Sequence, residues 1–475
     1  MRKPIVSLCI FCLLISPAFA GDISKADPRT MTFPELSFQI PKAERVVLEC
    51  GMPVYLLRDT ELPIINMTAM VRVGSVYEPG AKSGLASMAG NVMRSGGAGG
   101  MTPEKIDDEL EFMASSVESV IGSDMGMVSL ISLNKNFSRT LQIFSDVLLR
   151  PDFMVKRIEI ARKQAIEGLR RRNDDPKEIA GREIGKAIYA GHPLGDEVTF
   201  ASVNSITRQD IMDFHHRFYR LDNMILAVSG DFDRAALLGE LNAVFGPSVK
   251  SAALVLPEVP QPAQLFKGEI IYGKKDVNQS VIRMGHLGLS KDSPDIYAVR
   301  ILDYILGGSF TSRLTMEIRT NQGLAYSVGS HFDIGRRFTG SFIAETETKA
   351  ESTVRVISLM KKIITGISKE PVSDQELSAA REYLINSFMF GFTSPAAIVT
   401  QRARLEYYGY PDGYLEQYRD NIAKVTKKDV LNAARKYLRP EAFKLVVIGD
   451  AAKFDQPLSI PGVVRELDLK VNIPN

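Results

Sequence analysis

Histidine, which supplies many of the ligands of protein zinc sites, is scarce in this chain of 475 residues. The five histidines are His192, His215, His216, His286 and His331, and no two of them are three to five residues apart. His215 and His216 are adjacent, so on a helix their side chains would diverge by about 100° and could not bind one ion. The sequence therefore offers no histidine pair for zinc, and His192, in a GHPLG turn, is predicted to be structural.

Long apolar runs are missing as well, apart from one near the N-terminus that is too short for a bilayer span of about 20 residues. This run, residues 5–15, follows Arg2 and Lys3 and precedes a small-x-small site at residues 18–20. The pattern is typical of a secretory signal peptide, residues 1–20, and predicts a soluble mature protein that is periplasmic or secreted. Two of the three cysteines would leave with the signal peptide, so Cys50 would have no disulfide partner in its own chain.

The chain also lacks a strong charge of either sign. Lysine and arginine number 58 against 56 acidic residues, which gives a formal net charge of +2. This balance gives no reason to expect nucleic acid or an acidic membrane surface as a partner. The basic run Arg170 to Arg172 is followed by Asp174 and Asp175, which indicates a solvated helix face.

What the chain does contain is an internal repeat. Residues 206–231 align without gaps on residues 425–450 at an offset of 219, and this alignment pairs Thr207 with Thr426. Each copy reads as a threonine-capped helix followed by a β-rich run that ends in Gly-Asp. The period is far longer than the roughly 20 to 50 residues of a solenoid unit. The repeat therefore predicts two copies of one domain.

The predicted domains span residues 21–246 and 267–475, with an extended proline-rich linker at residues 247–266. In the first copy the apolar patterns predict strands near residues 64–73 and 127–133, and helices near residues 84–93, 136–149 and 152–172. Strands that cluster while helices lie to one side predict an α+β fold, with a sheet layered against helices in each domain.

Five segments follow one another in an order and at spacings that match a known family. They are VRVGSVYEPGAKSGLASMAGNVMRSG at 71–96, IEGLRRRNDDP from Ile166, AGHPLG from Ala190, YRLDNMILAVSGDFD from Tyr219 and LGGSFTSRLTMEIRTNQGLAYSVGS from Leu306. In these segments the chain resembles the insulinase/pitrilysin (inverzincin) metallopeptidase family. Because it lacks HxxEH, the chain is similar to the non-catalytic subunits of this family, as in the mitochondrial processing peptidase and bacterial two-subunit relatives. The resemblance implies two insulinase-like domains.

The zinc motif of that family, HxxEH, is degenerate in this chain. The resemblance places Ser87 and Asn91 at the two histidine positions and Gly90 at the glutamate position. Two imidazoles one helical turn apart bind the zinc and the glutamate activates its water, so this chain is expected to hold no metal and to have no peptidase activity of its own. Glu167 matches the position of the third zinc ligand, and we interpret it as vestigial or as a helix-surface residue.

A second signature of the family is retained in the C-terminal half. Arg319 and Tyr326 are seven residues apart in RTNQGLAY, a spacing that resembles the pair which the family presents towards a zinc site in another domain. The resemblance implies that they orient the peptide and stabilise the tetrahedral oxyanion, tasks suited to a guanidinium and a phenol. The alternative is a salt bridge at a helix end next to a core tyrosine.

Gly307, Gly308 and Ser309 are candidates for substrate binding. They close a helix that Ser293 and Pro294 are predicted to open as N-cap and first helical residue. Glycine at this point permits close backbone approach to a substrate, but it equally fits a helix C-cap and tight turn. Both interpretations remain open.

The number of domains suggests a function. The resemblance implies a chamber of four such domains, on one long chain or on two shorter ones, and this chain supplies two. The leading hypothesis is a non-catalytic, substrate-binding subunit of a heterodimeric periplasmic zinc peptidase. Its homologous partner would carry HxxEH and the zinc ion, while this chain would supply Arg319 and Tyr326. The alternative is a peptide-binding or scaffold protein of the same fold, without peptidase activity, for which a homodimer would suffice.

Overall fold

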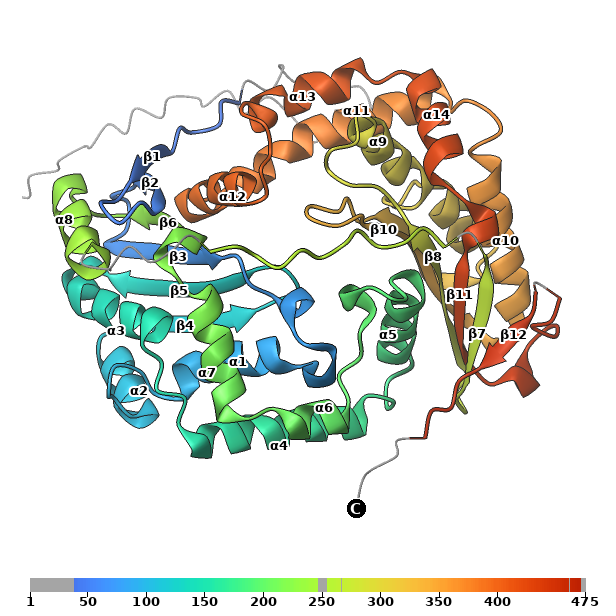
Figure 1. The fold of residues 1–475 in the computed structure, drawn as a ribbon. Helices are drawn as coiled ribbons and strands as arrows, with labels where there is room; N and C mark the ends of the chain where they lie inside the picture. The colour runs from blue at the N-terminus through green and yellow to red at the C-terminus, as the bar shows by residue number, and fades with distance from the viewer. Residues whose placement is uncertain (1–37, 247–253, 266, 461, 471–475) are drawn as a thin grey trace, which may run out of the picture. The chain divides into compact units, whose positions relative to one another are not determined.

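The computed structural model describes residues 38–246, 254–265, 267–460 and 462–470 (Figure 1). The predicted signal peptide lies outside these residues, as does the first part of the predicted linker. Residues 254–265 form neither helix nor strand. None of the helices in the described ranges is both long and apolar enough to cross a membrane. All helices and strands belong to one compact unit, residues 40–475.

The first half of the chain folds around a six-stranded sheet with the order β1-β2-β6-β3-β5-β4. Neighbouring strands are antiparallel except β2 and β6, which are parallel. The strands are β1 (Glu44–Val47), β2 (Pro53–Arg58), β3 (Ile64–Val71), β4 (Ser116–Ile121), β5 (Gly126–Leu133) and β6 (Met224–Gly230). The helices are α1 (Leu85–Ser95), α2 (Pro103–Phe112), α3 (Phe137–Leu149), α4 (Val155–Arg171), α5 (Pro176–Ile188), α6 (Phe200–Ser205), α7 (Arg208–Phe218) and α8 (Arg234–Phe245).

The second half repeats this arrangement with the strand order β12-β7-β11-β8-β10-β9. Here β7 runs parallel to both β11 and β12, and the other pairs are antiparallel. The strands are β7 (Glu269–Lys274), β8 (Gln279–Leu287), β9 (Ala325–Phe332), β10 (Ser341–Lys349), β11 (Lys444–Gly449) and β12 (Val464–Glu466). The helices are α9 (Ile296–Leu306), the π-helix η7 (Thr315–Asn321), α10 (Thr353–Gly366), α11 (Asp374–Ser387), α12 (Pro395–Tyr407), α13 (Tyr414–Lys424) and α14 (Lys427–Tyr437).

The sequence repeat corresponds to a structural repeat, so the predicted α+β fold with two homologous halves is confirmed. In α7 the backbone N–H of Asp210 donates to the hydroxyl of Thr207 at 3.2 Å, and in α14 Asp429 donates to Thr426 at the same distance. In turn, the carboxylate of each aspartate accepts a hydrogen bond from the backbone N–H of the threonine, which completes a capping box at each helix. Each helix leads into a central strand, β6 or β11, whose residues are all buried.

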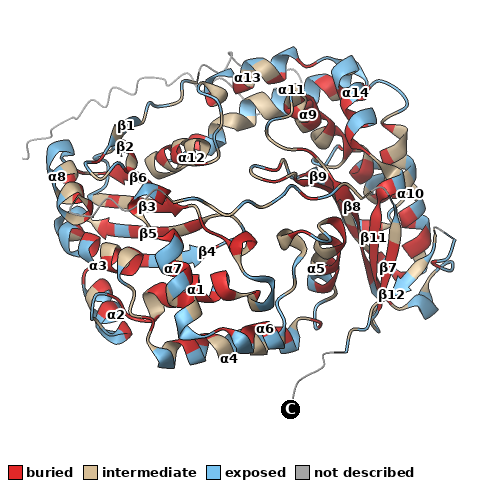
Figure 2. Cartoon of the chain, viewed as in Figure 1, coloured by how far each residue is buried: buried red, intermediate tan, exposed pale blue. Residues whose placement is uncertain are grey.

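One helix from each half packs on the sheet of the other half. Both bounds of α12 follow those of α5 by 219 residues, so the two helices are equivalent in the repeat. The buried face of α5 contacts β7, β8 and β11 of the second sheet, whereas that of α12 contacts β3 and β6 of the first (Figures 1 and 2). The residues involved are themselves equivalent: Ala180, Ile184 and Ile188 on α5 correspond to Val399, Ala403 and Tyr407 on α12.

Polar contacts hold α12 against the first sheet. The guanidinium of Arg45 donates two hydrogen bonds to the carboxylate of Glu406, at 2.7 and 2.8 Å. The hydroxyl of Tyr407 donates to the carbonyl oxygens of Val71, at 3.2 Å, and Asp124, at 2.6 Å. The exchange of helices is therefore secured by hydrogen bonds as well as by apolar burial.

The start predicted for α9 is wrong by two residues. The helix begins at Ile296, and Pro294 precedes it. The hydroxyl of Ser293 accepts a bond from the N–H of Asp295 at 3.2 Å and hydrogen-bonds the hydroxyl of Tyr437 at 2.7 Å. Because the serine hydroxyl forms this local turn and a tertiary bond, it does not cap the helix.

Candidate functional site

Helix α1 is the helix on which the zinc motif would stand. It follows Gly84, which has a φ of 102°, a left-handed conformation suited to glycine. The carboxylate of Glu78 accepts the backbone N–H groups of Gly84, at 2.9 Å, and Ala86, and so satisfies the start of the helix. Burial raises the pKa of Glu78 above its usual range. Ser87 and Asn91 are exposed, one turn apart, as the two histidines would be.

Gly90 is buried between α1 and the edge strand β4. A Cβ atom at this position would lie 2.6 Å from the backbone nitrogen of Ile121, which is shorter than any real contact. The hydroxyl of Ser119 on β4 donates to the carbonyl oxygen of Gly90 at 2.6 Å. The helix and the strand are thus so close that a glutamate at position 90 would require one of them to move.

Glu167 does not form part of a metal site. It lies on α4, where its carboxylate pairs with the guanidinium groups of Arg171 at 2.7 Å and Arg170 at 3.5 Å. Among the described residues, no three or more His, Cys, Asp and Glu side chains are placed to hold an ion together. With a serine and an asparagine at the imidazole positions and no space at Gly90, the residues present do not fit the zinc ion of the family.

The buried histidines have structural partners. The Nδ1 of His192 accepts from the N–H of Leu194 at 3.1 Å, and its Nε2 lies 3.0 Å from the carbonyl oxygen of Pro260, so the structural role predicted for His192 is confirmed. His215 and His286 also bond backbone carbonyl oxygens. Burial lowers the pKa of each to about 4, which keeps both neutral near pH 7.

Arg319 and Tyr326 are brought together at the surface of the second half. The guanidinium carbon of Arg319, on η7, lies 5.2 Å from the ring centroid of Tyr326, on β9. It also lies 5.4 Å from the ring of Phe310. Tyr326 is 87% exposed, so the alternative of a core tyrosine is wrong. No carboxylate among the described residues pairs with Arg319. Two exposed aromatic rings therefore flank a guanidinium whose donors are available.

Phe310 was not anticipated from the sequence, although it lies inside the segment LGGSFTSRL that carries the resemblance. It is 79% exposed, and large exposed aromatic side chains often mark contact surfaces. An apolar residue between a Gly-Gly turn and the arginine segment was the available signal. We name Arg319, Tyr326 and Phe310 together the arginine–aromatic cluster.

The glycines before this cluster have a packing role. A Cβ at Gly307 would lie 2.2 Å from the backbone nitrogen of Ser330, so the end of α9 lies directly against β9. Gly307 is the C-cap of α9, as one of the two interpretations predicted. The carbonyl oxygen of Ser309 accepts a bond from the hydroxyl of Thr315 at 3.1 Å, which connects the turn to η7. Gly308 is exposed beside them.

Two edge strands accompany these features. β4, next to α1, ends the first sheet, and β9, which carries Tyr326, ends the second. An edge strand presents backbone N–H and C=O groups on one side, and extended peptides bind to such edges by adding a strand. The arginine–aromatic cluster therefore lies beside a surface to which a peptide backbone can pair.

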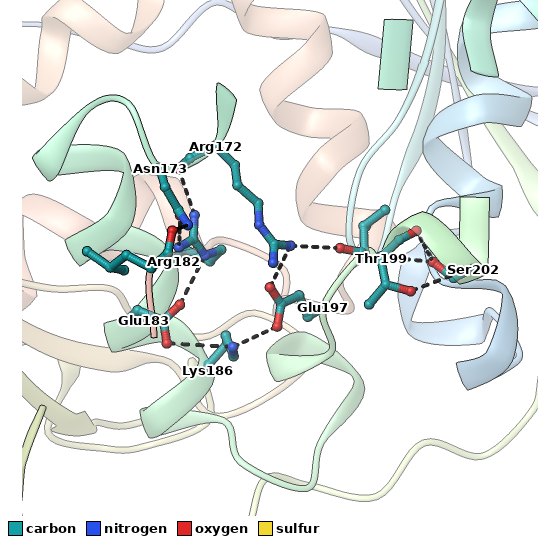
Figure 3. Close-up of polar contacts among 10 residues, drawn as sticks. Arg172, Asn173, Arg182, Glu183, Lys186, Glu197, Thr199 and Ser202 are labelled. Carbon is teal, nitrogen blue, oxygen red and sulfur yellow. Dashed lines mark hydrogen bonds and ion pairs between the residues drawn. The ribbon is translucent and has the colours of Figure 1, made fainter. Parts of the chain in front are cut away.

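A polar network anchors α5 near the end of α4 (Figure 3). Arg182 donates to the carbonyl oxygen of Arg172 at 2.9 Å and to the amide oxygen of Asn173 at 2.7 Å. Glu197 pairs with Arg172 and Lys186, both at 2.7 Å. Arg172, Arg182, Lys186 and Glu197 line a pocket of about 410 Å³, and each of the three cations pairs with a carboxylate. The pattern is that of a structural network.

Sequence comparisons identify the family. Residues 54–201 match the family described as insulinase (peptidase family M16), and residues 205–384 match the peptidase M16 inactive domain. The chain belongs to the M16 family. It is a pseudo-peptidase type of member, since α1 lacks the zinc ligands.

Individual relatives agree with this assignment. An uncharacterised zinc protease of Mycobacterium leprae is 26% identical over 72% of this chain and 75% of its own length. The non-peptidase homologue YmxG of Helicobacter pylori is 22% identical over 80% of this chain and 88% of its own.

Solved structures share the fold. A peptidase M16 inactive domain from Pseudomonas fluorescens superposes with a TM-score of 0.78 at 26% identity and covers 86% of this chain and 98% of its own. The periplasmic protease PqqL from Escherichia coli superposes with a TM-score of 0.72 at 14% identity. That match covers 88% of this chain but only 48% of PqqL.

Proposed function

We propose that this chain is the non-catalytic, substrate-binding subunit of a heterodimeric zinc peptidase and that it acts in the periplasm. The observation that carries the proposal is the contrast between α1 and the arginine–aromatic cluster. The first has lost the zinc ligands and has no space for the glutamate at Gly90, while the second keeps Arg319 adjacent to the exposed ring of Tyr326.

The extent of the structural matches supports a two-chain assembly. This chain aligns with about half of PqqL, which is a protease on a single longer chain. Two chains of this length would together have about the length of PqqL. The missing half would be a homologous partner that bears HxxEH.

In such a complex the partner's zinc ion would polarise the scissile carbonyl and supply the attacking water. The residues of this chain would act on the peptide. The β9 edge would align an extended backbone, and Phe310 would contact an apolar side chain. Arg319 and the phenol of Tyr326 would donate hydrogen bonds to the oxyanion, and one such donor is typically worth about 2.7 to 4 kcal/mol in the transition state.

The test uses the full-length mature chain with a candidate HxxEH partner from the same organism. We expect no hydrolysis of an extended fluorogenic peptide by this chain alone, and hydrolysis when the partner is added. Tyr326→Phe should lower kcat by about 10² to 10³-fold without changing stability, because the side chain is 87% exposed.

Tyr383→Phe is the matched control, since Tyr383 is a second exposed tyrosine, at 53%, on α11. It should leave kcat unchanged. Hydrolysis by the chain alone, or equal rates for Tyr326→Phe and the wild type in the mixture, would contradict the proposal. N-terminal sequencing of the exported protein tests the periplasmic location separately, with Gly21 as the expected first residue.

A peptide-binding or scaffold role without any peptidase is the second candidate, and the position of β4 and β9 at the ends of their sheets favours it. A homodimer would then be sufficient. Sedimentation of the native protein distinguishes the candidates: a homodimer that binds peptide, with no HxxEH chain co-purifying, supports the scaffold role.

A further inference from the structure

A second pocket, of about 570 Å³, opens between α9, the end of β9 and α12. Its polar lining consists mainly of arginines and tyrosines, namely Arg300, Arg336, Arg404, Tyr408, Tyr410 and Tyr414. Asp333 is the one acidic residue in the lining. The pocket therefore has an excess of positive charge, although the whole chain is nearly neutral. We refer to it as the arginine pocket.

The arginine pocket is the repeat equivalent of the pocket beside α5. In the pocket beside α5, this helix contributes Gly181, Arg182, Gly185 and Lys186. The positions 219 residues later on α12 are Thr400, Gln401, Arg404 and Leu405, all of which line the arginine pocket. The two pockets thus use the same face of equivalent helices. In the first, each cation meets a carboxylate of the same network (Figure 3).

The arginines of the second pocket have no such partners. Among the described residues, none of Arg300, Arg336 and Arg404 forms an ion pair. The Nε atoms of Arg300 and Arg404 are inaccessible to solvent and have no acceptor in the protein. A buried donor without an acceptor costs about 1 to 3 kcal/mol, more when it is charged, and a bound anion would remove that cost. The Nε of Arg172 beside α5 also lacks an acceptor, but there Glu197 neutralises the guanidinium.

Two of the arginines, Arg336 and Arg404, also repel one another. Burial and the neighbouring charge of Arg336 lower the pKa of Arg404. The guanidinium of Arg336 lies 5.5 Å from the ring centroid of Tyr408, which fixes it at the pocket without neutralising it. An anion would relieve the repulsion and accept the free hydrogen bonds.

We propose that the arginine pocket binds an oxyanion, the carboxylate of a peptide or a phosphate group, between the guanidinium groups of Arg300, Arg336 and Arg404. Planar guanidinium forks match the paired oxygens of both groups. The phenols and the apolar residues Ile334 and Leu405 would contact the organic part of the ligand. The site belongs to this chain alone, so it does not depend on a zinc-bearing partner.

The experiment is calorimetric titration of the mature chain without a partner. The probes are inorganic phosphate, a short peptide with a free C-terminal carboxylate, and the same peptide as its amide. We expect binding that Arg404→Gln weakens at least about tenfold. Arg336→Gln should also weaken it while leaving folding unchanged, because Arg336 is exposed. Asp333→Asn should strengthen it, since it removes the one negative charge in the lining.

Arg170→Gln is the charge-matched control, because Arg170 is an exposed arginine on α4 outside the pocket. It should leave every affinity unchanged. Binding of phosphate that depends on Arg404 identifies a phosphate ligand, and binding of the free-acid peptide alone identifies a peptide carboxylate. Absence of binding by all three probes, or equal affinities of the wild type and Arg404→Gln, overturns the proposal.

Discussion

The two halves of this protein share a fold but treat their polar groups differently. Around α5, Arg182 pairs with Glu183, and Lys186 pairs with Glu197. Around the equivalent helix α12, the Nε of Arg404 has no acceptor in the protein. Elsewhere in the same half, the half-buried Arg319 lies between two exposed aromatic rings. The comparison teaches that the duplicated scaffold preserves packing while its polar surfaces diverge. The network beside α5 pairs each of its cations with a carboxylate, whereas none of the three arginines of the arginine pocket forms an ion pair among the described residues.

The largest effect is expected when the glutamate of the zinc motif is restored in the first half. Gly90→Glu should lower the free energy of unfolding by more than the roughly 1 to 3 kcal/mol of ordinary overpacking, because the side chain meets the backbone of Ile121 and buries a carboxylate. Thermal denaturation measures the loss. Ser87→Glu on the exposed face of the same helix should change stability by no more than about 0.5 kcal/mol. If Gly90→Glu were as stable as the wild type, α1 would be free to accept the motif.

The next test compares the equivalent pockets directly. Arg182→Ala should cost about 2 to 4 kcal/mol, because the amide oxygen of Asn173 loses its donor and the buried Glu183 keeps only Lys186, at 3.6 Å. Arg404→Met should be neutral within about 1 kcal/mol or stabilising, since no acceptor in the protein loses a bond. Urea denaturation of both variants gives the comparison. Equal losses at the two positions would show that the arginine pocket is structural after all.

A pH-dependent contribution to folding stability is expected from Asp303 on α9, the helix that follows β8 as α1 follows β3. Burial raises the pKa of Asp303 to about 7, and the N–H of Phe332 donates to its carboxyl group at 3.0 Å. Because the folded state holds the proton more tightly than the unfolded chain, this group should make stability fall as the pH rises from about 4 to about 7.

Asp303→Asn removes that dependence while keeping an oxygen for Phe332. It should therefore stabilise the protein by about 1 to 3 kcal/mol more at pH 8 than at pH 5. Denaturation at the two pH values measures the difference, and Asp412→Asn on an exposed turn serves as the control. A gain that is the same at both pH values would show that Asp303 does not titrate in this range.

The smallest effects are expected at the N-caps of α7 and α14, where the two halves have the same geometry. Thr207→Ala and Thr426→Ala each remove the hydroxyl of a capping box with the same geometry, so each should cost about 1 kcal/mol. Thr320→Ala at an exposed position controls for the loss of a threonine side chain. Clearly unequal costs at the two caps, measured by thermal denaturation, would limit the structural equivalence of the halves.

Local features could be predicted from the sequence because they depend on neighbouring residues. The capped helices, strands β3 and β5 and the ends of the repeat follow from side-chain periodicity and short-range hydrogen bonds. The start of α9 was missed because Ser293 bonds Tyr437, a residue 144 positions away. Phe310 was missed because an apolar residue near a turn does not reveal its exposure.

By itself, the sequence determined that one domain occurs twice and, through its resemblance to the family, that the two histidines and the glutamate of the zinc motif are replaced by Ser87, Asn91 and Gly90. Both conclusions depend on residue identity and spacing along the chain. Only the tertiary structure decided that α5 and α12 pack on each other's sheets, because periodicity shows which helix face is apolar but not which surface covers it. For Arg404, the sequence gives the charge, but only the tertiary structure shows that its Nε has no acceptor, because the fold decides which side chains surround it.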